Sequence, residues 1–467
     1  MTGHQAAKGA VTTGGVTEDG VTERDTVGRV RARSADVALL AVSIIAAAVT
    51  HYRTYSTECV IVLACCVGAL GWAVWRDAGW QRPHPVSVGL ALLVAAGYQL
   101  YEPPHKNAVV TAWLWAGVWV SAAVTVLAVG LLALRGRWRG RLAGGLLGGL
   151  GLAYGLVIVG SPRALIDVWA ILQGAALGFW HGLNPYQMTF DGVPPGQVND
   201  CFNYLPVTFL APAPARLLVG DVRYAEAAVL FAGVAALAWR AYRVRTAGSV
   251  ALPLALLVGL LAGTLHDVQQ AWNETLLVGL LVGAAVLADR GRTWWAVACV
   301  AVALATKQHV VVLLPLLALW PAFGWRRMVA AGLGGAALCL PWLLWDPPRF
   351  TGCTVGFFLH LPARADSLSV WQWLPVGLGT PILLLTAATA YALAATRLPR
   401  DGAGLLLGWG LVLGGWDLIN KQSFLNQWLL VAQLVVAGLA LAASRSRLSD
   451  DHRVVVARRD QQATITR

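Results

Sequence analysis

The sequence has few charged residues. Asp, Glu, Lys and Arg make up 12% of its 467 residues, about half of the roughly 25% that is typical of soluble globular domains. With 57% hydrophobic residues and a mean hydropathy of +0.63, too few ionised side chains remain to cover a surface in water. The composition therefore excludes an ordinary soluble enzyme and indicates a chain that folds in a lipid bilayer.

Cysteine is also scarce, and its seven positions lack a CxxC pair or other metal-ligand spacing. We therefore expect no metal site and no cofactor. Five cysteines lie in apolar runs, where they should pack as small buried side chains: Cys59, Cys65, Cys66, Cys299 and Cys339. Cys201 and Cys353 fall in expected loops, where a disulfide and two free thiols are both open alternatives.

Apolar runs of spanning or near-spanning length recur along the chain. They lie at about 36–50, 59–75, 86–101, 108–134, 142–160, 222–239, 250–266, 271–288, 294–306, 308–322, 328–345, 374–396, 402–419 and 424–443. Since a span needs about 20 residues and several runs are shorter, we expect about 13–14 transmembrane helices. The sequence predicts an all-α polytopic membrane protein. Residues 1–35 and 444–467 are polar and are expected to be disordered cytoplasmic tails.

The basic residues are best explained by topology, although the net charge of +12 alone would suit a nucleic acid partner. Arginine clusters follow alternate apolar runs, the largest being Arg135, Arg137, Arg139 and Arg141. Lys and Arg favour cytoplasmic loops. This pattern predicts cytoplasmic N- and C-termini in a plasma-membrane protein and no role for nucleic acid.

Two expected outer segments, at about 161–221 and 346–373, are too long to be simple turns. The first holds an apolar stretch from Ala164 to Trp180, which we expect to be an amphipathic juxtamembrane helix ending before Gly182. The proline-rich stretch 202–219 should not span. Long ordered connections commonly carry function, so we expect functional residues in these two segments.

Asp167 is the strongest catalytic candidate. It follows a long apolar run, one helical turn after Arg163, in a stretch with no local need for a carboxylate. Ionisable residues at such positions are usually functional. The alternative is an i, i+4 ion pair between Arg163 and Asp167 that merely ends the helix at the interface.

Further polar side chains interrupt the apolar pattern on the same expected outer face. Lys307 and His309 break an apolar hairpin, where a cation could hold a phosphate or simply reach the lipid headgroups. Lys421 and Arg364 are the other candidates for binding a donor phosphate. Candidates for binding the rest of a substrate are His266, Asp267, Gln308 and His360. Asp267 and its neighbours could equally just solvate a turn.

One carboxylate with cations on one membrane face suits sugar transfer from a polyprenyl-phosphate donor. The leaving group departs as a phosphate anion, so no protein acid must protonate it, whereas a glycosidase needs two carboxyl groups. Asp167 would take the proton from an acceptor hydroxyl, and a cation would stabilise the charge that grows on the phosphate. Attack from the opposite face would invert the sugar carbon.

The order of these residues resembles a known family. An outer Asp167, a helix ending in Gly182, Asn184, Pro185 and Tyr186, and then Tyr204 and Pro206 look like family 87 of the C-type (GT-C) glycosyltransferases. These are the PimE-like, polyprenyl-phosphate-mannose-dependent mannosyltransferases of actinobacterial envelopes. The Lys307-Gln308 turn is similar to that family's pattern too.

The resemblance implies a fold, a reaction and a division of the chain. It implies a GT-C-like catalytic unit at 142–443 and makes Asp167 the base for α-mannosyl transfer to a glycolipid or glycan acceptor on the extracytoplasmic side. Asn184, Tyr186 and Tyr204 would help to bind substrate. Residues 36–134 lie outside the resemblance and would be accessory helices.

Two other classes of protein remain in consideration. A secondary transporter or a flippase for lipid-linked sugars would line its path with Asp167, Asp267 and Lys307. A noncatalytic scaffold in an envelope complex is the third alternative.

Overall fold

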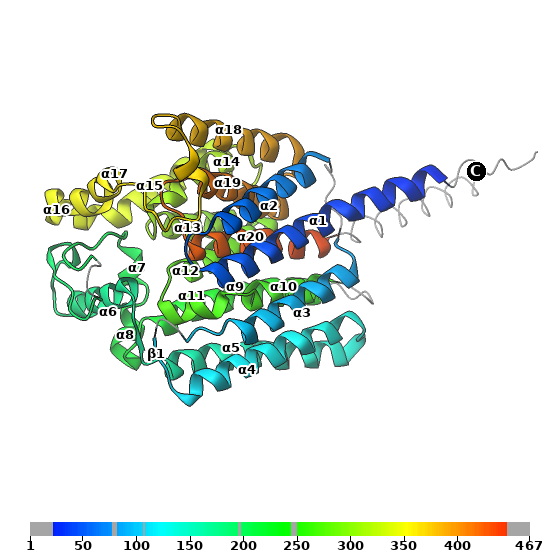
Figure 1. Cartoon of the computed structure of the whole chain (residues 1–467), viewed down its shortest axis with the longest axis horizontal. Coiled ribbons are helices and arrows are strands. Elements are labelled where there is room, and N and C mark those ends of the chain that lie inside the picture. Colours follow the sequence, from blue (N-terminus) through cyan, green and yellow to red (C-terminus); the bar gives the residue numbers. More distant parts are fainter. Residues whose placement is uncertain (1–21, 77–81, 106–107, 195–197, 244–249, 446–467) are drawn as a thin grey trace, which may run out of the picture.

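The computed structural model describes residues 22–76, 82–105, 108–194, 198–243 and 250–445, which form a bundle of helices (Figure 1). The first half of the chain contains α1 (Thr22–Tyr52), α2 (Thr57–Arg76), α3 (Pro85–Tyr101), β1 (Ala108–Val109), α4 (Ala112–Val129), η2 (Gly130–Leu132), α5 (Gly136–Gly160), β2 (Arg163–Ala164), α6 (Asp167–Trp180), η3 (Pro185–Gln187), α7 (Val207–Leu210), α8 (Ala213–Val219) and α9 (Arg223–Tyr242).

The second half contains α10 (Ala251–Leu260), α11 (Thr264–Gln270), α12 (Glu274–Asp289), α13 (Thr293–Leu304), η4 (Gln308–Leu313), α14 (Leu314–Leu319), α15 (Gly324–Trp345), α16 (Pro347–Thr351), η5 (Gly352–Gly356), α17 (Phe357–His360), η6 (Val370–Trp373), α18 (Gly379–Arg397), α19 (Gly402–Ile419) and α20 (Leu425–Ala443). The expectation of an all-α, multi-pass membrane fold is confirmed.

Nine helices among the described residues are long and apolar enough to cross a membrane. A tenth span results if α10 and α11, bent by 42° at their break, are one crossing. The expected 13–14 spans are therefore too many. Helices form at the remaining apolar runs, but several are short; α13, for example, has 12 residues. Polar turns divide these runs before they reach spanning length.

The first helices are built into the bundle. α1 packs against α2, α3 and α20, and α4 packs against α5 and α10. The expected division between 36–134 and 142–443 thus separates helices that pack together. α1 also begins at Thr22, within the segment expected to be a disordered tail; residues 1–21 and 446–467 of the expected tails lie outside the described residues.

The centre of the bundle is formed by helices that are buried along their whole length. Every residue of α10 and of α20 is buried, whereas α3, α15 and α18 expose large apolar side chains such as Leu90, Leu344 and Leu385. Exposed side chains of this kind suit contact with lipid. Cys65, expected to be buried, is also exposed on α2.

The two long connections gather at one end of the bundle. Figure 1 shows α6, α7 and α8 of the first connection at the same end as α16 and α17 of the second. Cys201 and Cys353 form a disulfide between these connections, which decides the alternative that the sequence left open. The stretch 202–219 forms two short helices, as expected for a segment that does not span.

An aromatic cluster fills the space between the connections. The Tyr186 ring lies 4.8 Å from Phe350 and 5.4 Å from Phe202, and Phe209 lies 5.0 Å from Trp342, measured between ring centroids. Edge-to-face ring pairs of this kind stabilise by about 0.5–1.5 kcal/mol beyond their burial. The cluster and the disulfide together hold both connections in place.

We predict that replacing both Cys201 and Cys353 by serine lowers the thermal unfolding midpoint. The disulfide closes a loop of sequence separation 152, and loss of a native disulfide commonly costs about 2–5 kcal/mol. Intrinsic tryptophan fluorescence of detergent-solubilised protein measures the shift, and the Cys339→Ser variant is the control. Unchanged unfolding of the double variant, or thiols at 201 and 353 that alkylate without reductant, would contradict the assignment.

Candidate functional site

Asp167 is the first residue of α6, at the end of the bundle that carries the two connections. Its Oδ1 accepts a hydrogen bond of 2.8 Å from the Val168 N–H. Burial raises the pKa of the Asp167 carboxyl, while that hydrogen bond and the charge of Arg364 act in the opposite direction. A half-buried carboxyl with a raised pKa is suited to accept a proton.

The helical ion pair considered for Arg163 and Asp167 is not the arrangement in the structure. Arg163 lies on β2, which pairs antiparallel with β1, and α6 begins only at Asp167. The Arg163 guanidinium donates to the Gly192 carbonyl at 3.4 Å. The two residues therefore do not share a helical turn, and the juxtamembrane helix is three residues shorter than expected.

Tyr204 connects the surroundings of Asp167 with a second polar group deeper in the bundle. Burial raises the pKa of the Tyr204 phenol, and the nearby charges of Asp167, Glu274 and Glu226 raise it further. The Tyr204 carbonyl accepts a hydrogen bond of 3.0 Å from the Tyr186 hydroxyl. The aromatic cluster thus fixes the backbone of Tyr204, and its side chain lies near enough to Asp167, Glu274 and Glu226 for their charges to act on it.

Asn184 and Tyr186 serve the packing of the first connection. The Asn184 side chain caps η3 by accepting the Tyr186 N–H at 3.1 Å, and Tyr186 is fully buried among aromatic rings. Both residues are therefore buried in the packing of the first connection, and their expected contact with substrate stays a prediction.

The second polar group is centred on an ion pair between Lys307 and Glu274. Their side-chain nitrogen and oxygen lie 2.5 Å apart, with Glu274 fully buried and Lys307 14% exposed. Lys307 occupies the turn between α13 and η4, as expected. The sequence did not identify Glu274 as its partner, because the two residues lie 33 positions apart.

Three more buried carboxyl groups surround this pair. The charges of Asp267 and Asp417 interact with both Lys307 and Glu274, and the charge of Glu226 interacts with Glu274. Neither carboxylate oxygen of Asp267 has a hydrogen-bond partner among the residues that the structure describes, and the same is true of Glu226. We call Glu226, Asp267, Glu274, Lys307 and Asp417 the acid cluster.

The acid cluster contains residues that the sequence analysis missed. Glu226 and Asp417 are lone acids inside the apolar runs at 222–239 and 402–419. The criterion that selected Asp167, an ionisable residue without local need in an apolar stretch, also fits both of them. Burying several carboxyls beside one lysine is costly unless they hold protons or bind a ligand or water.

His309 and His266 also lie within this region. His309 is close enough to Lys307 and Glu274 for their charges to interact with its ring. His266 and Asp267 are buried on α11, which lies just after the break that follows α10. Both histidines therefore lie near the acid cluster. The sequence analysis had expected them in turns on the outer face.

The other expected phosphate-binding groups have partners within the protein. The Lys421 Nζ donates to the carbonyls of Leu361 at 2.6 Å and Leu359 at 3.3 Å. Arg364 forms an exposed ion pair of 2.6 Å with Asp366. Its charge also acts on Asp167, where it lowers the pKa of the carboxyl.

The two remaining candidates, Gln308 and His360, contact backbone carbonyls. The Gln308 amide donates to Asn203 at 2.9 Å and to Thr354 at 3.0 Å, which joins both connections to the Lys307 turn. His360 is exposed, and its Nδ1 lies 2.8 Å from the Gly356 carbonyl. Gln308 therefore holds the site together, and His360 lies at its surface.

Arg223 joins three helices next to the acid cluster. Its fully buried guanidinium pairs with Asp221 at 2.6 Å and donates to the Gln269 carbonyl at 3.0 Å and to Ser161 Oγ at 3.2 Å. It thereby ties the start of α9 to α11 and to the end of α5. Arg223 is not among the site residues expected from the sequence.

The described residues contain no group of three or more His, Cys, Asp or Glu side chains that could hold a metal ion.

Known proteins give little further information. No protein-family model matches the sequence, and no curated protein shows significant sequence similarity. Two crystal structures of ArnT from Cupriavidus metallidurans share part of the helix arrangement. The one bound to undecaprenyl phosphate has a TM-score of 0.44 and 16% identity, over 72% of this chain and 61% of ArnT.

The apo structure of ArnT gives a similar result. Its TM-score is 0.41 at 18% identity, over 72% of this chain and 60% of ArnT. The aligned region therefore spans about three fifths of ArnT. At TM-scores below 0.5 the likeness assigns no residue role and no activity.

We predict that Lys307→Met destabilises the protein more than Glu274→Gln. Removing one partner of a buried pair typically costs about 3–5 kcal/mol because a charge is left uncompensated. In Lys307→Met, the charges of Glu274, Asp267 and Asp417 all lose the cation that offsets them. In Glu274→Gln, the remaining charge is that of Lys307, which is 14% exposed and can reach water. Thermal unfolding in detergent measures the difference. Arg349→Met, which removes an exposed cation, is the control, and equal stability of Lys307→Met and wild type would contradict the prediction.

Proposed function

We propose that this protein is a GT-C-type membrane glycosyltransferase. It transfers a sugar, mannose, from a polyprenyl-phosphate donor to a glycolipid or glycan acceptor with inversion. The observation that carries this proposal is the half-buried Asp167 carboxyl, with its raised pKa, beside Tyr204 and Arg364 at the end of the bundle.

Asp167 acts as the general base in this proposal. It accepts the proton of the acceptor hydroxyl while the hydroxyl oxygen attacks the anomeric carbon, and the bond from that carbon to the phosphate oxygen breaks. The polyprenyl phosphate leaves as an anion. The cations near the site, Arg364 and Lys307, stabilise its charge, with Lys421 as a further cation. His309, whose burial disfavours the charged ring, is a candidate hydrogen-bond donor to the phosphate.

The acid cluster assists the same reaction by keeping Lys307 in place. Glu274 holds the Lys307 ammonium at 2.5 Å while leaving it 14% exposed. An arriving phosphate competes with Glu274 for this cation, as a point charge with three donors allows. The buried carboxyls with unpaired oxygens, Asp267 above all, offer acceptors to sugar hydroxyl groups.

We place this chemistry on the extracytoplasmic face of the plasma membrane, with both termini in the cytoplasm. Arginine clusters mark the opposite ends of the spans as cytoplasmic. The disulfide between Cys201 and Cys353 supports the assignment because disulfides persist in oxidising compartments.

A transporter or flippase of lipid-linked sugars is the second candidate. The break between α10 and α11 and the buried acid cluster favour it, because transporters place ionisable groups at broken helices. Membranes supplied with labelled polyprenyl-phosphate-mannose separate the two functions. Label in a new glycolipid or glycan supports transfer, whereas label that crosses the membrane without a new linkage supports transport.

We expect Asp167→Asn to reduce sugar transfer by about 10²–10⁴-fold, the usual contribution of a general base, with little effect on thermal unfolding. Asp191→Asn, which neutralises an exposed carboxyl of the same connection, is the matched control and should retain activity. Transfer of labelled mannose in washed membranes is the measurement. Turnover of Asp167→Asn at the wild-type rate would rule out Asp167 as the base.

Transfer should decline at acidic pH, with a midpoint above the ordinary aspartate value of 3.8. Burial raises the pKa of the Asp167 carboxyl, so protonation inactivates the base at a higher pH than it would in water. The profile of kcat/KM against pH for wild type and for Asp191→Asn should show the same limb. The residual activity of Asp167→Asn should not show this decline at acidic pH. If the decline persists in Asp167→Asn, the group that titrates is not Asp167.

A further inference from the structure

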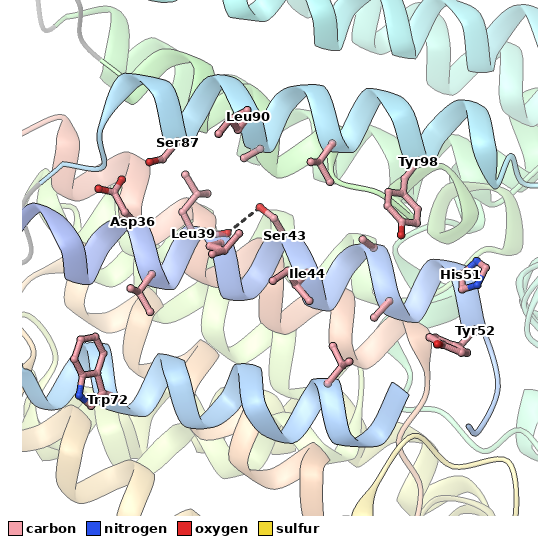
Figure 2. Close-up of a pocket in the computed structure, with 17 residues that line it drawn as sticks. Asp36, Leu39, Ser43, Ile44, His51, Tyr52, Trp72, Ser87, Leu90 and Tyr98 are labelled. Carbon is pink, nitrogen blue, oxygen red and sulfur yellow. Dashed lines mark hydrogen bonds between the residues drawn. The ribbon is translucent and has the colours of Figure 1, made fainter. Parts of the chain in front are cut away.

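A cavity of about 690 Å³ lies between α1, α2 and α3, outside the residues 142–443 to which the sequence assigned catalysis. Figure 2 shows its lining, with Leu39 and Ile44 on α1, Leu90 on α3 and Trp72 on α2. Most of the lining is apolar. Leu40 and Leu90, which both line the cavity, are 61% and 58% exposed, so the cavity is a groove that opens on the surface facing lipid.

The groove is longer than one leaflet of a bilayer. Its lining on α1 runs from Asp36 to Tyr52, which corresponds to about 24 Å at 1.5 Å per residue. One leaflet of the hydrocarbon core is about 15 Å thick, half of roughly 30 Å. A single extended chain that fills this groove must therefore be longer than the acyl chain of a lipid confined to one leaflet.

The two ends of the groove differ in their polar side chains. The carboxyl of Asp36 and the hydroxyl of Ser87 line one end, and His51, Tyr52 and Tyr98 line the other (Figure 2). An anionic headgroup is repelled by Asp36 and can accept hydrogen bonds from the imidazole and phenol groups. The carboxyl of Asp36 at one end and the hydrogen-bond donors at the other thus favour a phosphate at the His51 end.

The His51 end continues into the region that holds Asp167. The His51 ring lies 3.3 Å from Glu102, which also pairs with Arg53 at 3.1 Å. Two residues further along, the Pro104 carbonyl accepts a hydrogen bond from the side chain of Gln269 at the end of α11. β1 then pairs with β2, which ends three residues before Asp167.

We propose that this groove binds the prenyl chain of a polyprenyl phosphate, with the phosphate at the His51 end. The proposal rests on the proposed function for the class of lipid. It adds a second lipid site, separate from the reaction at Asp167. A carrier held here lies along the lipid-facing side of α1, α2 and α3, with its phosphate toward the end of the bundle that carries Asp167.

The test uses the full-length protein in detergent and a polyprenyl phosphate that carries a photoreactive diazirine on its chain. Because this probe has no sugar, labelling is independent of turnover. Mass spectrometry should find the label in residues 36–52 and 87–98. Excess unlabelled polyprenyl phosphate should suppress labelling, whereas the same excess of phosphatidylglycerol should leave it.

Two tryptophan substitutions provide a matched pair on α3. Leu90→Trp fills the groove and should reduce labelling by about tenfold, equivalent to roughly 1.4 kcal/mol. Leu93→Trp places the same side chain at a residue that is 49% exposed but does not line the groove, and should leave labelling unchanged. Thermal unfolding of both variants shows whether either has lost its fold.

His51→Ala tests the position of the phosphate. Wild type should prefer polyprenyl phosphate over polyprenol as a competitor, and His51→Ala should lose that preference. Equal suppression by phosphatidylglycerol, label confined to other helices, or equal loss in Leu90→Trp and Leu93→Trp would overturn the proposal. A protein that fails to transfer sugar but still labels in this groove would contradict the proposed function alone.

Discussion

The ion pair between Lys307 and Glu274 is the interaction on which the polar interior of this protein depends. Glu274 is fully buried, so its charge is stabilised by Lys307 and not by contact with bulk water. The lysine comes from the turn after α13, so the pair fixes that turn against the start of α12. Without the cation, Glu274, Asp267 and Asp417 would share a region of low dielectric with no charge to offset them. The ion pair therefore lowers the free-energy cost of burying the neighbouring carboxyl groups of Asp267 and Asp417.

The two long connections convert this interior into an accessible site. The disulfide, the aromatic cluster and the two hydrogen bonds from Gln308 join segments that are far apart in the sequence, and all of them converge on the Lys307 turn. Asp167 begins α6 at this junction, and Tyr204 follows on the same connection. The base that we propose is thus a carboxyl at a helix end, near a tyrosine whose backbone is fixed by Tyr186.

The buried carboxyls have different surroundings, which suggests different roles. Asp167 is half-buried and accepts a backbone hydrogen bond, so a substrate can approach it. Asp267 is fully buried with unpaired oxygens, and Glu274 is already engaged by Lys307. Only the first arrangement suits proton transfer to and from an acceptor at the membrane surface. The groove on α1–α3 extends this picture, because it would hold a long lipid chain beside the bundle while its headgroup faces the end that carries Asp167.

The sequence alone determined the class of the fold, the two long connections, the candidate Asp167 and the turn at Lys307, because each is written in local composition: apolar runs, breaks in them, and isolated charges. It left the pairing of Cys201 with Cys353 open and overestimated the number of spans, since apolarity does not show where Gly263 and neighbouring residues break a helix. Only the tertiary structure decided that Lys307 meets Glu274, that Glu226 and Asp417 join them, and that Arg223 is a buried anchor. These contacts join helices that are distant along the chain, and their existence depends on packing geometry, which no local pattern encodes.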